Sequence, residues 1–150
     1  MKKLLSTTVL SLLLVSLASG VYGQDAPDFE ETKALAEQGE AFAQFNLGVM
    51  YNNGLGVPKN DAEAVRWYKL AAEQGEALAQ FNLGVMYYNG LGVPQNNVRA
   101  YVWWSVAAAQ GIGDARTNRD IFSERLAPEQ LTRGQDMATR CFESDFQDCE

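Results

Sequence analysis

The sequence contains a long internal duplication. Residues 36–58 read AEQGEAFAQFNLGVMYNNGLGVP, and residues 72–94, 36 positions later, read AEQGEALAQFNLGVMYYNGLGVP. Only two of these 23 aligned positions differ: Phe42 is aligned with Leu78, and Asn52 is aligned with Tyr88. A repeat of this length is typical of stacked helical hairpins, in which each unit contacts only its neighbours. The duplication therefore predicts an all-α solenoid, an architecture that holds partners more often than it performs chemistry.

Each repeat divides into two amphipathic helical patterns separated by the turn GLGVP. The first pattern places Gln44, Leu47 and Tyr51 on one face, and the second begins at the expected helix cap, Asp61 or Asn97. Two such helices with a short connection form an antiparallel hairpin. Carried along the chain, the pattern predicts seven helices, at about 28–38, 40–53, 61–74, 76–89, 97–110, 113–126 and 128–143.

The repeat pattern weakens toward both ends of the chain. The N-terminal unit has only the second helix of a hairpin. The last unit lacks the GLGVP turn and has Asp120 where the preceding repeat has Gly84. A charged, degenerate last repeat closes the open end of a solenoid. The repeat domain, 24–150, then divides into a partial repeat (28–39), two full repeats (40–75 and 76–111), a capping repeat (112–143) and an acidic tail (144–150).

The N-terminal segment, residues 1–23, has the composition of a secretory signal peptide. Lys2 and Lys3 precede an apolar run and then small residues, which favours cleavage after Gly23 or, alternatively, after Gly20. The run is too short to span a bilayer, although an uncleaved anchor is the competing interpretation. We expect a periplasmic or secreted protein with no membrane span after cleavage.

The net charge narrows the possible partners, and the cysteine content predicts a cross-link. Removing Lys2 and Lys3 with the signal peptide changes the net charge from −7 to −9, which disfavours nucleic acid and anionic lipid because both bind mainly Lys and Arg. In an exported protein, the two cysteines, Cys141 and Cys149, predict one disulfide that fixes the tail to the last helix.

Several kinds of chemistry lack the residues they need. The chain has no His, which removes imidazole-based catalysis and His-ligated metals, and it has neither a P-loop nor a dinucleotide fingerprint. We therefore expect no cofactor and no metal.

The acidic residues Asp145, Asp148 and Glu150 are expected to form a frayed, solvated tail. The tryptophans could form a stacking platform for a sugar or peptide, but core packing is the favoured interpretation for Trp67, Trp103 and Trp104.

The repeated motif, A-x-A-Q-x-N-L-G-x-M-Y followed by N-G-x-G-V-P and A-A-x-Q-G, resembles the Sel-one-like repeat, a relative of the tetratricopeptide repeat. The resemblance covers about residues 29–143. It implies a right-handed α/α superhelix that serves as an adaptor or scaffold, often in bacterial envelopes. Some cysteine-rich relatives have been linked to β-lactam hydrolysis, but this chain lacks their paired cysteines in each repeat and has no S-x-x-K motif.

Mapping onto the tetratricopeptide pattern gives a candidate concave groove on the first helix of each hairpin. Both differing positions of the duplication fall within it, as a diverged binding surface would leave them. Its residues are Phe42, Phe45, Val49, Asn52 and Asn53, with Leu78, Phe81, Val85, Tyr88 and Asn89 as their counterparts. Burial of Phe45, Val49, Phe81 and Val85 between hairpins is an equally weighted alternative.

These features predict an exported, non-enzymatic module that binds another envelope protein or an extended peptide through aromatic and aliphatic anchors, with Asn side chains bonding the ligand backbone. The alternatives are a β-lactam- or peptidoglycan-acting enzyme and a regulator of a cell-wall enzyme. The oligomeric state is not indicated by the sequence.

Overall fold

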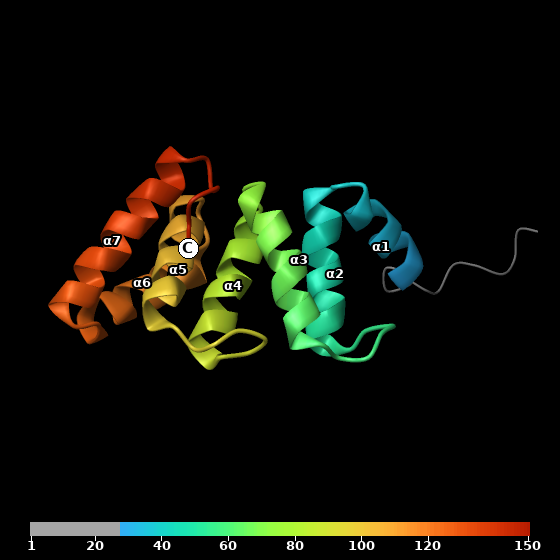
Figure 1. Cartoon of the computed structure of the whole chain (residues 1–150), viewed down its shortest axis with the longest axis horizontal. Helices are drawn as coiled ribbons and strands as arrows, with labels where there is room; N and C mark the ends of the chain where they lie inside the picture. The colour runs from blue at the N-terminus through green and yellow to red at the C-terminus, as the bar shows by residue number, and fades with distance from the viewer. Residues whose placement is uncertain (1–27) are drawn as a thin grey trace, which may run out of the picture.

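A computed structural model describes residues 28–150 of the chain, so the predicted signal peptide lies outside the described residues. Seven α-helices and no strand occur in this part, in a row from α1 at one end to α7 at the other (Figure 1). The helices are α1 Phe29–Glu37, α2 Ala41–Asn53, α3 Asp61–Glu73, α4 Ala77–Asn89, α5 Asn97–Ala109, α6 Gly113–Arg125 and α7 Pro128–Glu143. Every predicted helix is confirmed, with each end within one residue of its expected position. None of these helices is both long and apolar enough to cross a membrane.

The two helices after the GLGVP turns are capped one residue earlier than the sequence indicated. The caps are Asn60 and Asn96, whose backbones are extended and whose side-chain oxygens accept a hydrogen bond from the N–H three residues later, at 3.1 and 3.0 Å. The expected caps, Asp61 and Asn97, are instead the first helical residues. Asn is among the best cap residues because its side chain replaces a hydrogen bond that the first turn lacks.

The core lies between the helices of each hairpin and between neighbouring hairpins. Leu47 and Leu83, at equivalent positions of the two repeats, are fully buried. Trp67, Trp103 and Trp104 are also buried, at 2–5% exposure, which confirms their predicted packing role. The tryptophans therefore hold the hairpins together and are not free to form a stacking platform.

Two glycines allow the helices of a hairpin to approach closely. A Cβ atom on Gly48 would lie 2.6 Å from the ring of Tyr68, and one on Gly84 would overlap the ring of Trp104. Real Cβ atoms do not come this close, so only glycine fits at either position without displacing a buried aromatic ring. The last repeat has Asp120 here because α7 packs against α5 and brings no such ring onto α6.

A buried glutamine in each repeat ties the turn between hairpins to the core. The Nε2 atom of Gln44 donates to the carbonyl of Ala36 at 3.2 Å, and its Oε1 accepts from Gln74 at 2.8 Å. Gln80 and Gln110 repeat the side-chain pair one unit later. Since an unpaired buried amide is costly, these bonds explain why a polar residue occupies the packing face.

The last seven residues are ordered against the helices, so the expectation of a frayed tail is wrong. The disulfide between Cys141 and Cys149 closes the segment onto α7. Asp148 pairs with Arg140 at 3.3 Å, and the side chain of Glu150 forms ion pairs with α3 and α5. The predicted disulfide is therefore confirmed, and the tail that it holds has both carboxylates beside basic side chains on the helices.

Candidate binding face

The ten residues of the candidate groove lie on α2 and α4, and none of them is buried. Five are exposed, including three with large apolar or aromatic side chains: Phe42 at 63%, Leu78 at 42% and Tyr88 at 38%. The other five are half-buried: Phe45, Val49, Asn52, Phe81 and Val85. The four apolar members of this second group pack against the core with one side and reach solvent with the other. All ten positions are therefore accessible, at least in part, from outside.

The aromatic side chains of the first repeat form a short row. The ring centroids of Phe42 and Phe45 lie 6.1 Å apart, and the same distance separates Phe45 from Tyr68 of α3. Burial raises the pKa of Tyr68 to about 12, against a smaller lowering effect of its hydrogen bond with Asn82. Tyr68 therefore stays neutral at ordinary pH and supports Phe45, whereas Phe42, at the solvent end of the row, has most of its ring uncovered.

The aromatic residue of the second repeat is more deeply embedded than its position on the groove suggested. The ring of Tyr88 lies 6.0 Å from Trp104 of α5 and 5.1 Å from Phe122 of α6, in tilted and edge-on arrangements. Such geometry favours aromatic pairs. Tyr88 thus joins the second repeat to the capping repeat, in addition to presenting part of its ring to solvent.

Each asparagine of the groove already donates at least one amide N–H within the protein. Asn52 donates to Asp61 at 3.1 Å and contacts the sulfur of Met86. Asn53 and Asn89 each donate to the carbonyl four residues earlier on their own helix, at 2.9 and 3.0 Å. Among residues 28–150, none of the three amide oxygens accepts a hydrogen bond. These oxygens could therefore accept from a ligand's backbone N–H, and Asn53 and Asn89 each keep a second amide N–H that could donate.

The capping repeat adds one apolar residue that the groove prediction did not include. Ile121 of α6 is 40% exposed and stands 36 positions after Val85, as Val85 stands 36 after Val49. The neighbouring Phe122 is equivalent in the same way to Met86, which explains why Tyr88 meets an aromatic ring where Asn52 meets a thioether sulfur. The 36-residue spacing carried this signal, but the change in sequence after Asn118 obscured it.

These residues give a face that is apolar, with neutral amides at one end of each helix. The described residues of this face include no paired nucleophile and base, and its aromatic side chains suit contact with apolar side chains of a partner.

Comparison with known proteins agrees with this architecture. The family model for the Sel1 repeat matches residues 41–76 and 77–112. No curated protein matches the chain. The crystal structure of c5321, a protective antigen present in uropathogenic Escherichia coli strains and displaying an SLR fold, is 34% identical with a TM-score of 0.74. That match covers 79% of this chain but only 26% of c5321, so the chain spans about a quarter of that protein.

A second solved structure is similar over most of its own length. The Sel1 repeat protein from Oxalobacter formigenes is 38% identical with a TM-score of 0.59, and the match covers 61% of this chain and 68% of that one. Proteins of this kind are repeat modules for protein–protein interaction and are typically non-catalytic. With its two matched repeats and these relatives, the chain belongs to the Sel1 repeat family.

Proposed function

We propose that the protein is an exported, non-enzymatic adaptor that binds an envelope protein, or an extended peptide segment of one, on the candidate groove of α2 and α4. The observation that carries this proposal is the set of exposed apolar side chains at equivalent positions of successive repeats. Phe42 and Leu78 occupy one such pair, and the half-buried Val49 and Val85 with the exposed Ile121 form a second series. A monomer gains nothing in stability from uncovered side chains of this size, whereas a partner that covers them gains their burial.

An extended peptide suits this face because the apolar positions recur from one helix to the next. A peptide that crosses the equivalent helices could place one apolar side chain against Phe42 and another against Leu78. The free oxygens of Asn53 and Asn89 could accept hydrogen bonds from its backbone. Buried aromatic anchors carry most of the binding energy in such contacts, so Phe42 is the strongest candidate for an anchor in the first repeat.

The test is a comparison of matched variants with a partner captured from periplasmic extract by the mature chain. Dissociation constants would be measured by calorimetry for the parent, for a Phe42→Ala/Leu78→Ala double variant and for Leu70→Ala. Leu70 is 36% exposed on α3, outside the groove, and serves as the control for removal of an exposed Leu. We expect the double variant to bind about 30-fold more weakly or worse, the equivalent of about 2 kcal/mol, and the control to bind as the parent does. Equal losses in the two variants would exclude the groove as the binding face.

Export is supported by the composition of residues 1–23 and by the disulfide, which is typical of oxidising compartments. Protein isolated from its host should begin at Gln24, or at Val21 if cleavage follows Gly20. Intact Met1 on protein from the cytoplasm would contradict the proposal.

A regulator of a cell-wall enzyme is the same binding function with a more specific partner, and the captured partner would identify it. The enzymatic alternative predicts turnover of a chromogenic β-lactam such as nitrocefin. We expect no turnover above the uncatalysed rate, and a rate that disappears on substitution of a single side chain would overturn the non-enzymatic proposal.

A further inference from the structure

The carboxylate of Glu150 occupies a site formed by three helices. Lys69 of α3 lies 2.8 Å from both carboxylate oxygens, and the hydroxyl of Tyr87 of α4 donates a hydrogen bond to one of them. The guanidinium of Arg99 of α5 is 4.0 Å away. All three charged side chains are about one-third exposed. A carboxylate with two cations and a hydroxyl donor around it has the contacts expected of a built anion site.

Both cations of the site also lie near one aromatic ring, that of Tyr87. The Lys69 ammonium and the Arg99 guanidinium lie 5.8 and 5.5 Å from the centre of the Tyr87 ring. Aromatic rings attract cations at such distances, but two cations at one ring repel each other. An anion between them relieves this repulsion, so the geometry favours occupation by a carboxylate.

The positions 36 residues earlier provide an internal comparison, because they do not form an anion site. Lys33, Tyr51 and Glu63 stand 36 residues before Lys69, Tyr87 and Arg99, respectively. Lys33 and Glu63 pair instead with neighbours on their own helices, Glu37 and Arg66. A single change from acidic to basic, Glu63 to Arg99, distinguishes the second location. The basic character therefore belongs to the site of Lys69, Tyr87 and Arg99 and is absent from the equivalent positions 36 residues earlier.

The pKa shifts of Glu150, Lys69 and Tyr87 agree with a charged pair, Glu150 and Lys69, beside the neutral hydroxyl of Tyr87. Burial opposes the charge of Glu150, but its hydrogen bonds with Lys69 and Tyr87 outweigh this effect and lower its pKa. Burial likewise opposes the charge of Lys69, but its hydrogen bonds with Glu150 and Tyr87 raise its pKa. Burial, followed by the hydrogen bond with Glu150, raises the pKa of Tyr87. At neutral pH the site therefore holds one carboxylate, one ammonium and a protonated phenol.

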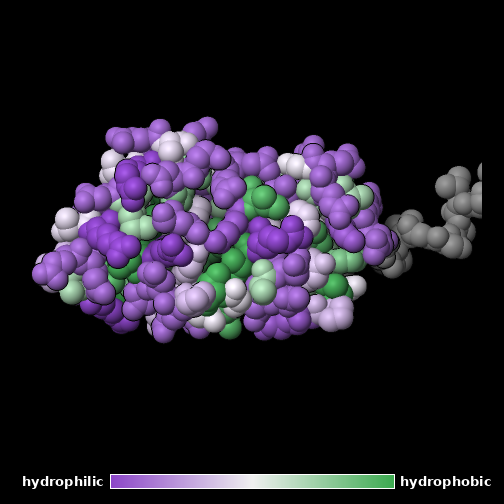
Figure 2. All heavy atoms as spheres, in the orientation of Figure 1, coloured by the Kyte–Doolittle hydropathy of each residue, from purple (hydrophilic) through white to green (hydrophobic). Residues whose placement is uncertain are grey.

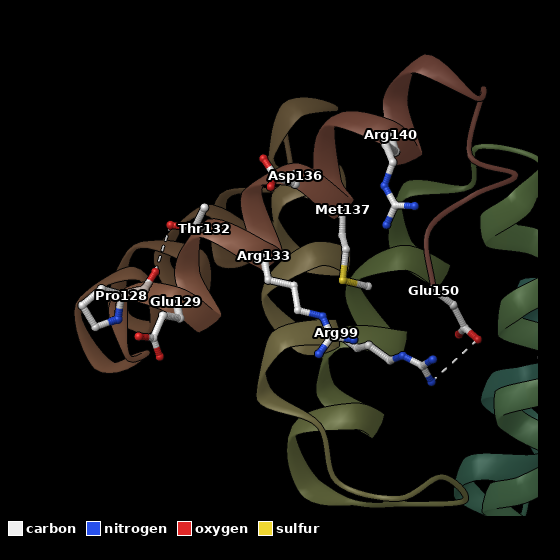
Figure 3. Close-up of a pocket in the computed structure, with 9 residues that line it drawn as sticks. All are labelled: Arg99, Pro128, Glu129, Thr132, Arg133, Asp136, Met137, Arg140 and Glu150. Carbon is white, nitrogen blue, oxygen red and sulfur yellow. Dashed lines mark hydrogen bonds and ion pairs between the residues drawn. The ribbon is translucent and has the colours of Figure 1, made fainter.

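The site opens onto a cleft from which a second carboxylate can approach. Glu150 borders a cavity of about 880 Å³. Figure 3 shows Arg99 directed toward Glu150, with Arg133, Met137 and Arg140 of α7 along the cleft. The acidic lining residues other than Glu150 are Glu129 and Asp136. In the view of Figure 2, hydrophilic residues cover most of the surface, and hydrophobic residues appear as small separate patches. Displacement of Glu150 would leave Lys69 and Arg99 without the carboxylate that pairs with them, an arrangement that suits an acidic ligand.

From this arrangement we infer that Lys69, Tyr87 and Arg99 form a binding site for an acidic side chain of a partner peptide, and that Glu150 occupies this site in the free protein. The site lies away from the candidate groove, since Val85 and Tyr87, two residues apart on α4, point in nearly opposite directions at roughly 100° per residue. It is thus a second interaction surface, independent of the proposed function.

The disulfide makes Glu150 a strong competitor for its own site. Cys149 is bonded to Cys141, so the tail confines the adjacent Glu150 near the three helices. Short tethers give effective concentrations in the millimolar range. If the effective concentration is on the order of 10 mM and a free peptide binds with a dissociation constant on the order of 1 mM, Glu150 weakens peptide binding about tenfold.

The experiment measures binding of a synthetic peptide with the sequence of residues 144–150, in which serine replaces Cys149, by NMR titration of isotope-labelled protein. We expect Glu150→Ala protein to bind it about tenfold more tightly than the parent, with shifts centred on the backbone amides of Lys69, Tyr87 and Arg99. A peptide carrying glutamine at the position of Glu150 should bind much more weakly. Equal affinity of the parent and the Glu150→Ala variant, or of the two peptides, would overturn the inference.

A matched variant separates the site from a general charge effect. Arg99→Glu, made in the Glu150→Ala background, gives the second repeat the residue of the first, Glu63, and should abolish peptide binding. Arg125→Glu in the same background changes the charge equally on α6 and should retain most of it. Circular dichroism would verify that both variants fold. Loss of the groove through Phe42→Ala/Leu78→Ala should leave peptide affinity unchanged, so failure of this inference and failure of the proposed function are distinguishable.

Discussion

Truncation of Tyr88 should destabilise the fold, although more than a third of its side chain is exposed. The ring makes two aromatic contacts, with Trp104 and Phe122, and each contributes about 0.5–1.5 kcal/mol. Loss of the covered part of the ring removes roughly another 1–2 kcal/mol of burial. We therefore expect Tyr88→Ala to lower the free energy of unfolding by about 2–5 kcal/mol, with a fall in Tm on the order of 10 °C.

The assay is chemical and thermal unfolding followed by far-UV circular dichroism. Leu78→Ala on the same helix is the matched control, because Leu78 is similarly exposed, at 42%, and makes none of these ring contacts. The control should remain within about 0.5 kcal/mol of the parent. If Tyr88→Ala is as stable as Leu78→Ala, the aromatic contacts contribute nothing to stability and the link between the second and capping repeats is wrongly described.

Three further predictions concern packing, pH and the disulfide. Gly84→Ala should destabilise the protein by about 1–3 kcal/mol in denaturant unfolding, because the added Cβ overlaps a buried ring. Gly113→Ala, with nothing within 4 Å of its added Cβ, should be neutral or slightly stabilising, and the reverse order would refute the close approach. Since the pKa of Glu150 is lowered from its ordinary 4.5, its contribution is present above that pH and is lost as the pH falls further. The stability curves of the parent and Glu150→Gln should therefore converge in acid; a constant gap down to pH 2 would contradict this. Oxidised protein should show no free thiol from Cys141 or Cys149 in a titration, and reduction should cost roughly 2.5 kcal/mol or less without loss of helix. Free thiol in the oxidised protein, or complete unfolding on reduction, would count against the disulfide's role.

The arrangement of helices could be predicted from the sequence because its signals are local and repeated. Glycine-rich turns, helix caps and apolar spacing mark each helix end within a few residues of chain, and the second repeat checks the first. Burial of Trp67 and Trp103 followed in the same way from their equivalent positions. The cap positions were wrong by one residue because Asn60 and Asp61 are both good cap residues, and so are Asn96 and Asn97.

Contacts between distant residues could not be predicted in this way. The Tyr88 contact with Phe122 depends on how the second hairpin packs against the capping repeat, where the sequence no longer follows the motif. The Glu150 contact with Lys69 joins residues 81 positions apart, and no local pattern indicates it. The binding role of the groove remains a prediction, although the exposure of Phe42, Leu78 and Tyr88 agrees with it.

The central claim, that the α2 and α4 face binds a partner, is tested most directly by site-specific cross-linking in the native host. A photoreactive phenylalanine analogue would replace Phe42 or Leu78 in the groove, or Leu70 on α3 as the control. We predict that irradiation yields the same adduct from both groove positions and none from position 70. No adduct from either groove position, or equal adducts from all three, would contradict the account.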